Sequence, residues 1–361
     1  MQIQTEPIGS IPRPVELILG IRAHAAGQLN NRDLQHLYDS AIADTIKRFE
    51  ATGSPVISDG EQTKPSFATY PIHGLPNLSA DGVVIPFADG HTRQLPILTS
   101  GPFHYQTFSD SYLKKAKRLT SLPVKQAVIS ASAISLLYPP EGIEGYPREQ
   151  FIKDLINEAA ADIRRNLNSD AYNVQIDFTE ARLSLKLDPS GGLLQSFIDL
   201  NNLVLGRFTA EERKKIGVHS CPGGDHDSTH SADISYAILL PLLFKLNAGN
   251  FYLEYAGEKN KSQVLNIIKQ NLKPGQRIFL GVTNVLDPRI ETPDEIRDTI
   301  LEAAETLPVS QLGTTDDCGF SPFADDLSTS REIAFAKIKA RIDGTNLAVA
   351  AINKRRHFFQ A

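Results

Sequence analysis

Residues 214–224 read KKIGVHSCPGG, a short apolar run that carries His219 and Cys221 at its end and is followed by two glycines. In an extended segment, residues two apart point to the same side, so an imidazole nitrogen and a sulfur can meet just past a strand end. Such a pair is half of a site for a borderline-soft metal, and zinc is the usual occupant. A structural histidine beside a buried cysteine would give the same pattern, so core packing stays open as the alternative.

Two further residues offer ligand atoms. Cys318, in QLGTTDDCGFSPF, is the second of the two cysteines in the 361 residues, and it ends a predicted strand-to-loop segment with Gly319 behind it. Glu254 lies inside the apolar run NFYLEYAG, where a carboxylate is costly unless it is paired or bound to a cation. The N-terminus, MQIQTEPIGS, has no apolar run typical of a secretory signal, so we expect a cytoplasmic protein whose cysteines are ligands, nucleophiles or core residues.

The composition is that of an ordinary globular chain, with 41% hydrophobic and 22% charged residues. A formal net charge of −5 and a pI of about 6.0 give no indication of a nucleic-acid or anionic membrane partner. No apolar run approaches the roughly 20 residues that a transmembrane helix needs. The length allows one large domain or two small ones, and a single domain over residues 1–361 is predicted.

Short apolar runs alternate with amphipathic helical patterns along the chain, which is typical of a parallel sheet. Eight strands are predicted, at residues 3–8, 55–58, 124–130, 172–176, 216–218, 251–255, 277–282 and 312–316. Helices are predicted at residues 31–52, 109–119, 148–167, 191–206, 232–246, 262–271, 293–306 and 330–351, with Asn31 and Thr292 as caps. The rhythm breaks at about 68–108, which predicts a β-hairpin excursion after the second strand. Together these patterns predict an α/β fold, a (β/α)8 TIM barrel.

Unusual polar residues fall at or just past the carboxyl ends of the predicted strands. In TIM barrels this rim holds the active site in essentially every characterised case, so the placement favours a metal site over core packing. The residues that share this placement are Ser10, Asp59, Glu61, Asp177, His219, Cys221, Glu254 and Cys318.

Six motifs in this order resemble one family: GSIPRP near the start, SDGEQ after the second strand, VQID after the fourth, HSC after the fifth, LEYA on the sixth and DDCG after the eighth. The family is that of the cobalamin-independent methionine synthases, specifically their C-terminal catalytic barrel, a relative of uroporphyrinogen decarboxylases. The resemblance covers nearly the whole chain and implies a stand-alone catalytic barrel that lacks the family's N-terminal barrel.

The resemblance also implies the roles of individual residues. It implies a zinc ion held by His219, Cys221, Glu254 and Cys318. It further implies that homocysteine is held by Ile8, Ser10, Glu61 and Asp177.

Zinc would keep the bound thiol as a thiolate, and Glu61 and Asp177 would bind the α-ammonium group and orient the substrate during catalysis. A solvated turn remains the alternative for Asp59 and Glu61, and a helix cap or an ion pair for Asp177.

The half of the site that would bind the methyl donor departs from the family. The chain has no Trp to stack on a pterin ring, and the matching stretch VISASAIS offers small residues. The family's general-acid histidine is also missing, since GVTNVLDPR carries Asn284 and Asp287 there. His230, in DHDSTHSAD, is a candidate replacement acid. With His226, four residues earlier, it could instead share a helix face as a second metal site or lie in a plain polar loop.

Three functions follow. The first is zinc-dependent methyl transfer to homocysteine, giving methionine, from a methyl-folate, another methyl carrier or a methyl-carrier protein. The second is alkyl transfer to another thiol such as coenzyme M, although Glu61 and Asp177 favour a thiol that bears an ammonium group. The third is a barrel with a structural zinc, since closed four-ligand sites are typical of structural zinc. For Arg13 and Lys64, near the predicted rim, anion binding and plain surface charge are both open.

Overall fold

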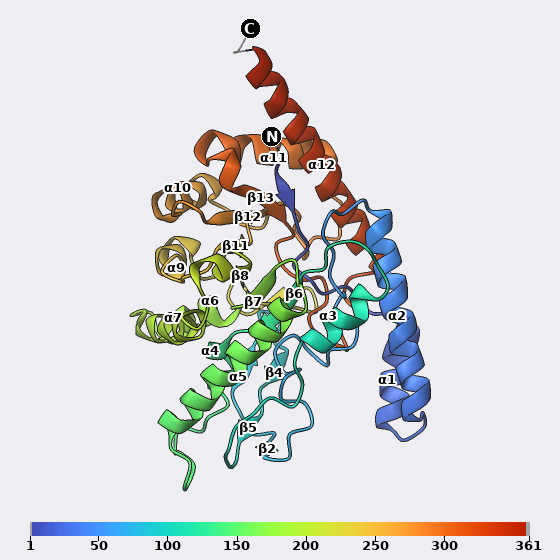
Figure 1. The fold of residues 1–361 in the computed structure, drawn as a ribbon, viewed down its shortest axis with the longest axis vertical. Coiled ribbons are helices and arrows are strands. Elements are labelled where there is room, and N and C mark those ends of the chain that lie inside the picture. The colour runs from blue at the N-terminus through green and yellow to red at the C-terminus, as the bar shows by residue number, and fades with distance from the viewer. Residues whose placement is uncertain (1, 359–361) are drawn as a thin grey trace.

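The computed structural model describes residues 2–358 and has an α/β fold built on a curled parallel sheet (Figure 1). Every pairing in this sheet is parallel, as the alternating pattern predicts. In spatial order its strands are β1 (Gln4–Thr5), β13 (Leu312–Thr315), β12 (Arg277–Gly281), β11 (Asn250–Leu253), β8 (Ile216–Ser220), β7 (Val174–Asp177) and β6 (Gln126–Ile129).

The prediction of eight strands is wrong by one among the described residues, because residues 55–58 form only an isolated parallel bridge from Ile57 to Val124. Pro55 cannot donate to a strand ladder, which shortens the pairing. Side-chain and loop bonds join this segment to the chain after β1 instead. The Ser58 hydroxyl donates to the Gly9 carbonyl at 2.7 Å, and the Ile11 amide donates to the Gly60 carbonyl at 3.0 Å. These bonds hold the two segments together beside the sheet's edges.

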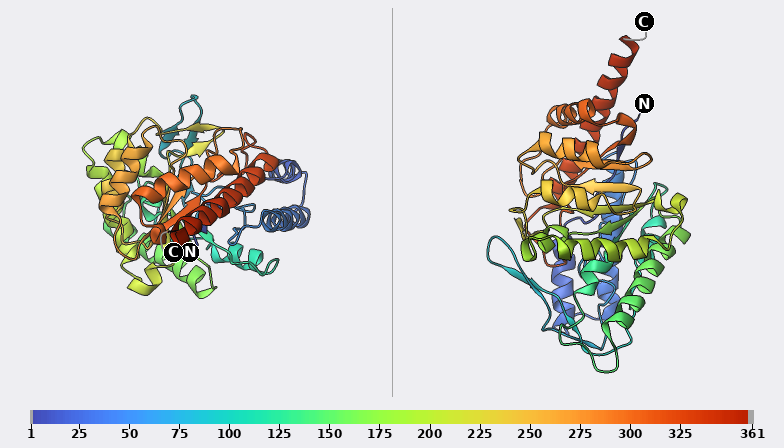
Figure 2. Two further views of the ribbon diagram at one scale, coloured as in Figure 1. Left: turned by 90° about the horizontal axis from the view of Figure 1, so that it is seen from above. Right: turned by 90° about the vertical axis from the view of Figure 1, so that its left-hand side faces the viewer.

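Helices lie around the outside of the curled sheet (Figure 2). They are α1 (Val15–Ala25), α2 (Asn31–Ala51), α3 (Asp110–Lys117), α4 (Ala131–Ser135), α5 (Arg148–Asn168), α6 (Glu180–Leu187), α7 (Gly192–Leu205), α8 (Ala210–Arg213), α9 (Tyr236–Leu243), α10 (Lys261–Asn271), α11 (Pro293–Thr306) and α12 (Arg331–Phe358), with a 3-10 turn at Val309–Gln311. Among these, α1, α4, α6 and α8 were not predicted. No helix of the described residues combines the length and apolarity that crossing a membrane requires.

The helix caps show where local sequence decides the structure. Thr292 caps α11 with a reciprocal capping box, as predicted. For α2 the cap is Asn30 rather than Asn31, because the Asn30 side chain accepts a hydrogen bond from the Asp33 amide. The helix predicted at 232–246 begins only at Tyr236, since residues 224–229 form the antiparallel pair β9 (Gly224–Asp225) and β10 (Ser228–Thr229).

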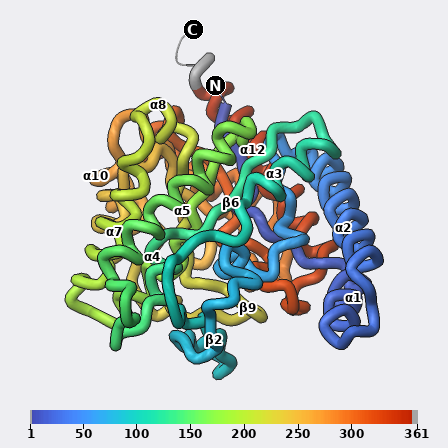
Figure 3. The backbone as a smooth tube through the Cα atoms, turned by 60° about the horizontal axis from the view of Figure 1, so that its bottom comes forward, coloured from blue at the N-terminus to red at the C-terminus, as the bar shows by residue number. Residues whose placement is uncertain are grey.

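The segment between residues 78 and 98 contains two antiparallel pairs. They join β2 (Leu78–Ser79) to β5 (Ile97–Leu98) and β3 (Val84–Pro86) to β4 (Thr92–Gln94). The Ala88 amide donates to the Thr229 carbonyl at 2.9 Å, so the tip of this segment rests on the β9–β10 pair (Figure 3). The segment therefore reaches the carboxyl end of β8.

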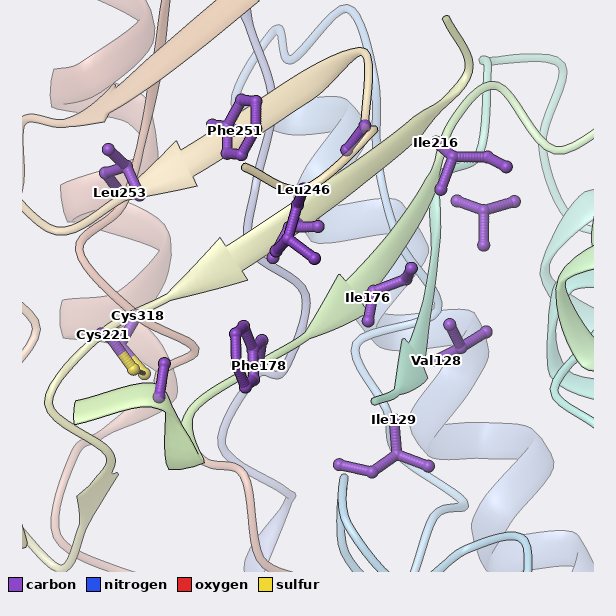
Figure 4. Close-up of a cluster of buried hydrophobic side chains, with 14 of the residues drawn as sticks. Val128, Ile129, Ile176, Phe178, Ile216, Cys221, Leu246, Phe251, Leu253 and Cys318 are labelled. Carbon is purple, nitrogen blue, oxygen red and sulfur yellow. Dashed lines mark hydrogen bonds between the residues drawn. The ribbon is translucent and has the colours of Figure 1, made fainter. Parts of the chain in front are cut away.

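The buried core reaches this same end of the sheet. Figure 4 shows aliphatic and aromatic side chains of β6, β7, β8 and β11 packed together, with Cys221 and Cys318 at the margin of the cluster. The two sulfurs lie next to each other, although 97 residues separate them along the chain. The core thus fixes the positions of the residues that form the site.

Candidate metal centre and substrate cavity

Three predicted ligands form a compact cluster. His219 lies on β8, Cys221 follows it, and Cys318 follows β13. One ligand atom from each lies within 4.8 Å of the others, and the two sulfurs are 3.1 Å apart. Both cysteines are free and buried, so they form no disulfide. The structure therefore brings together side chains that could hold a single metal ion.

The hydrogen bonds of His219 fit the role of a metal ligand. Its Nδ1 lies 3.2 Å from the carbonyl oxygen of Tyr252, whereas its Nε2 is buried with no hydrogen-bond partner. A buried polar atom without a partner is costly, and a metal ion at Nε2 would remove that cost. Metal-bound histidines commonly donate their other N–H to a backbone carbonyl, and Tyr252 offers such a carbonyl.

The two sulfurs affect each other's ionisation. The hydrogen bond between them, together with His219, holds the pKa of Cys318 well below its usual value, and the same hydrogen bond raises the pKa of Cys221 well above it. A divalent cation bound to both sulfurs would favour the thiolate form of each. Two sulfurs and one imidazole nitrogen form a donor set that zinc prefers.

Glu254, one residue beyond β11, is buried but does not belong to the three-residue cluster. Its carboxylate accepts a hydrogen bond from Arg182 at 3.1 Å, and Arg182 also pairs with Glu258. Burial and the charge of Asp317 raise the pKa of Glu254 well above its usual value. In this structure the charge that balances Glu254 is therefore a guanidinium.

A cavity of about 370 Å³ lies against the cluster. His219 and Cys318 line it, and so do the four residues predicted to hold an amino-acid thiol, namely Ile8, Ser10, Glu61 and Asp177. These residues come from the carboxyl ends of β7 and β8 and from the loops that follow β1, β13 and residues 55–58. The structure thus places two of the four predicted ligands, His219 and Cys318, and all four predicted thiol-binding residues around one space.

Glu61 reaches the cavity from a left-handed backbone conformation, with φ of 56°. Its carboxylate pairs with Lys64 at 2.8 Å, and Lys64 also donates to the Ala127 carbonyl at 3.0 Å. Asp59, Glu61 and Lys64 are each no more than 3% exposed, so a solvated turn is excluded. Plain surface charge is wrong for Lys64, because this buried ammonium is paired with Glu61.

Asp177 ends β7 and faces the same cavity. The Gln175 side-chain amide donates to it at 2.7 Å. Burial and the nearby charge of Glu61 raise the pKa of Asp177 to about 6. Two carboxylates that repel each other across a buried space favour a cation between them, such as the ammonium group of an amino acid.

Arg13 supports the loops around this cavity. Its buried guanidinium donates to the backbone carbonyls of Glu61 and Lys64, both at 2.8 Å, and of Phe323 at 2.9 Å. Arg13 therefore ties the loop that carries Glu61 to the loop that follows Cys318. Plain surface charge is therefore wrong for Arg13, because the side chain is buried and both terminal nitrogens donate to backbone carbonyls.

His226 and His230 do not share a helix face, because the segment that carries them folds as the β9–β10 pair and His226 has φ of 48°. His230 lines the cavity, and burial lowers its pKa to about 4. Its imidazole is therefore neutral at pH 7. His226 instead approaches Asp225 and Asp326.

The Arg93 guanidinium occupies that second cluster. It lies 2.5 Å from Asp225 and 3.1 Å from the His226 Nε2. A cation is thus already present where a second metal would have to bind. Arg93 also pairs with Asp325 at 2.9 Å, so one side chain links the β3–β4 segment to the loops after β8 and β13.

The sequence does not predict several residues that lie at the site. Phe87, from the segment between β3 and β4, lines the cavity, stacks on His91 with ring centroids 4.3 Å apart and meets His230 edge-on. Arg182 and Glu180 lie on α6, a helix that was not predicted. The only local signal was an arginine and a glutamate in the otherwise apolar FTEARLSL, and nothing in that pattern indicates their partners.

Residues 3–331 match the family model described as the cobalamin-independent synthase catalytic domain. The chain belongs to this family. A methionine synthase of Sulfurisphaera tokodaii is 21% identical over 345 residues, which cover 96% of this chain and 92% of the relative. A methionine synthase of Saccharolobus solfataricus is 22% identical, with 98% of this chain and 97% of the relative covered.

A solved structure of a B12-independent methionine synthase from Shewanella sp. W3-18-1, in complex with selenomethionine, matches the fold. The TM-score is 0.75 at 18% identity, and the match covers 98% of this chain and all of the other. The resemblance inferred from the six motifs is thereby confirmed. In the loop after β12, Asn284 and Asp287 accept hydrogen bonds from backbone amides of their own loop, those of Leu286 and Arg289.

Proposed function

We propose that this member of the cobalamin-independent synthase family transfers a methyl group to the sulfur of homocysteine and so forms methionine. The observation that carries the proposal is the shared cavity, which is lined by His219 and Cys318 of the His–Cys–Cys cluster and by Glu61 and Asp177. Such a space suits a molecule with a thiol at one end and an ammonium group at the other. Relatives of nearly the same length that are named methionine synthase support the assignment.

We assign zinc to His219, Cys221 and Cys318, with Glu254 as the fourth ligand. A bound zinc ion would stabilise a thiolate at neutral pH, the form that attacks a methyl carbon. Arg182 would then keep Glu254 oriented and partly neutralise the anionic ligand set. The buried margin of the core around the cysteines excludes water and strengthens these charge interactions.

Glu61 and Asp177 would bind the α-ammonium group of the substrate and set its orientation. Lys64 holds the Glu61 carboxylate in place, and Gln175 does the same for Asp177. Ile8 and Ser10 would bound the rest of the amino-acid end. The Ser10 hydroxyl accepts a hydrogen bond from the Ser321 amide at 3.2 Å, which couples it to the loop after Cys318.

The methyl donor would occupy the remaining part of the cavity, which is largely apolar. Phe67, Phe87 and Phe323 supply aromatic surface there in place of the missing tryptophan. This lining suits the flat ring of a methyl-folate or the apolar part of another methyl carrier. A sulfonate thiol such as coenzyme M is disfavoured, because the carboxylates of Glu61 and Asp177 at the amino-acid end of the cavity would repel a sulfonate.

We also propose a closed eight-stranded barrel, a single domain and a cytoplasmic location for this protein. Residues 55–58 would serve as the eighth strand of a closed barrel. Residues from about 68 to 108 would form a β-hairpin excursion from it, and the whole chain would be a single domain. The protein would act in the cytoplasm, without a nucleic-acid or membrane partner.

Zinc content and X-ray absorption at the zinc edge, with and without homocysteine, test this function. We expect about one zinc per chain, and one additional sulfur in its coordination shell when homocysteine is present. Methionine formation from homocysteine and methyltetrahydrofolate would complete the test. A zinc shell that ignores homocysteine would indicate a structural metal, and absence of zinc after metal-replete purification would overturn the assignment.

A further inference from the structure

Glu180 is a buried acid that the proposed ligand and thiol-binding roles leave unused. It is the first residue of α6, three positions after Asp177, and it is 5% exposed. Its Oε1 accepts hydrogen bonds from the hydroxyls of Ser130 and Ser132, both at 2.5 Å. Its Oε2 is buried with no hydrogen-bond partner, and the residue lines the cavity. The carboxyl group is thus anchored through one oxygen and free at the other.

This asymmetry determines where a proton would reside. Two hydroxyl donors point at Oε1, so the acidic proton belongs on Oε2. Burial raises the pKa of Glu180 to about 7, although the two serine hydrogen bonds act in the opposite direction. A substantial fraction of the side chain is therefore a neutral carboxylic acid at neutral pH, with its proton on the oxygen that has no partner.

Few charges act on Glu180 from the surrounding elements. Asp177 on β7 raises its pKa, whereas Ser130, which caps α4, and Ser132, on α4, are uncharged. The helices α4 and α9 carry no charged residue, and the one charged residue of α7, Asp199, is exposed and accepts from Gln195. On α6 itself, Arg182 pairs with Glu254 and Glu258, and Lys186 with Asp233.

Methyl transfer from a nitrogen atom requires an acid. As the thiolate attacks, the sulfur–carbon bond forms and the carbon–nitrogen bond breaks, so the electron pair of that bond stays on nitrogen and needs a proton. In this chain the loop after β12 offers Asn284 and Asp287, both of which cap backbone amides. The pKa of His230 is lowered to about 4, so its imidazole is neutral at pH 7. The imidazolium form, which could donate a proton, is therefore scarcely populated at that pH.

We propose that Glu180 donates, from Oε2, the proton that the leaving nitrogen of the methyl donor takes up. The inference rests on the proposed methyl transfer to homocysteine. The step leaves Glu180 as a carboxylate, which Ser130 and Ser132 stabilise through Oε1, and water restores the proton after the products leave. No oxidant or reductant is needed.

The first test compares wild type with Glu180→Gln, using homocysteine and methyltetrahydrofolate. Loss of a general acid should lower kcat by about 100-fold to 10,000-fold. Homocysteine binding, followed by the added sulfur at the zinc edge, should be unchanged, because among the described residues the Glu180 carboxyl group is hydrogen-bonded only to Ser130 and Ser132, and glutamine adds no charge beside Asp177. Glu158→Gln is the matched control, since Glu158 is a half-buried glutamate that accepts from the Tyr105 amide away from the cavity and should keep wild-type kcat.

The second test uses pH. Wild-type kcat should fall as pH rises through about 7, the pKa of Glu180, because the acid form is lost. Ser132→Ala removes one hydrogen bond that favours the carboxylate, so the pKa of Glu180 should rise. The fall of kcat with rising pH should then occur at a higher pH than in wild type. A residue that only supports the fold would lower activity without moving this fall.

The outcomes separate this inference from the function on which it rests. If Glu180→Gln keeps wild-type kcat, or if homocysteine binding falls along with kcat, the assignment of the proton donor is wrong while methyl transfer stands. If Ser132→Ala leaves the fall of kcat at the wild-type pH, that fall belongs to another group and the inference is again wrong. If wild type makes no methionine from methyltetrahydrofolate or another methyl donor, the proposed function fails and this inference fails with it.

Discussion

His219 is fixed by one ring nitrogen and unpartnered at the other, within 4.8 Å of two sulfurs. The carbonyl of Tyr252 selects the tautomer that leaves Nε2 as a lone-pair donor. The alternative of a plain core histidine explains the burial but not the missing partner at Nε2. The pattern around single residues therefore favours a metal ligand over packing.

Replacement of Cys318 tests the ligand set at this scale. Cys318→Ser removes one of two sulfurs, so the zinc content measured by mass spectrometry should fall from about one per chain to a small fraction. Ser220→Ala is the matched control, because Ser220 lies between His219 and Cys221, is fully buried and has no hydrogen-bond partner for its hydroxyl. Retention of full zinc by Cys318→Ser, after dialysis against a weak chelator, would contradict the assignment.

His230 gives a pH-dependent stability that can be measured directly. The native pKa of about 4 lies below the ordinary 6.5, so between these values the unfolded chain binds more protons and stability falls as pH falls. The loss amounts to about 3 kcal/mol and is complete below about pH 4. His230→Asn should flatten the dependence of the unfolding free energy on pH between 4 and 6.5.

Denaturant unfolding at several pH values measures this effect. His104→Asn serves as the control, because His104 is exposed, and its pH dependence should match that of wild type. An unchanged slope in His230→Asn would show that another group dominates stability in this window.

At the scale of elements, prediction succeeded where local sequence decides the outcome. The strand before His219 and the capping box of α11 were both readable, because periodicity and a Thr-x-x-Glu spacing are local signals. The helix predicted at 232–246 was too long by several residues. There His226 and Asp227 adopt left-handed conformations that allow the tight β9–β10 pair, and no local pattern indicated them.

The same contrast holds for the site. Strand-end positions could be inferred from the alternation of strands and helices, so His219, Cys221 and Cys318 were found. The ion pairs around the site could not be inferred in this way. Arg182 and Glu254 are 72 residues apart in the sequence, and Arg93 and Asp225 are 132 residues apart. Contacts of this range depend on the tertiary arrangement of several elements, which propensity and spacing do not encode.

Arg93 acts as a link between elements, and its removal should loosen the β3–β4 segment. Arg93→Met leaves the fully buried Asp225 carboxylate with only His91 and His226 beside it, at a cost of about 3 kcal/mol in unfolding free energy. Hydrogen exchange at residues 84–94 should accelerate. The double variant Arg93→Met/Asp225→Asn should recover about 1–2 kcal/mol, because the unpaired charge is gone.

Arg289→Met is the control for this prediction. Arg289 forms an exposed pair with Glu295, so its loss should change the unfolding free energy by less than about 1 kcal/mol. Equal effects of the two arginine variants, or unchanged exchange at residues 84–94, would argue against a linking role for Arg93.

At the scale of the whole molecule, buried polar contacts join the two ends of the described chain. Arg341 on α12 donates to the Thr5 hydroxyl at 2.7 Å and to the Glu6 carbonyl at 2.8 Å, and it pairs with Asp316. Glu6 in turn accepts from Tyr252 on β11 at 2.7 Å. The segment after β1 is therefore fixed inside the sheet by contacts that do not involve the metal cluster.

Removal of the metal tests whether the cluster serves catalysis or the fold. The apolar core and the contacts of Arg341 and Arg13 stay intact without zinc, so the chelated protein should keep its far-UV circular dichroism and unfold in one cooperative transition. Saturation with zinc at 100 times Kd would contribute about 2.7 kcal/mol. With an unfolding entropy of about 2.1 cal/mol/K per residue, this corresponds to a Tm higher by about 4 °C. A structural zinc would behave differently, since proteins that depend on one lose their fold when it is removed. Loss of secondary structure on chelation, restored by zinc alone, would therefore assign the cluster to folding and leave the cavity without its proposed thiol chemistry.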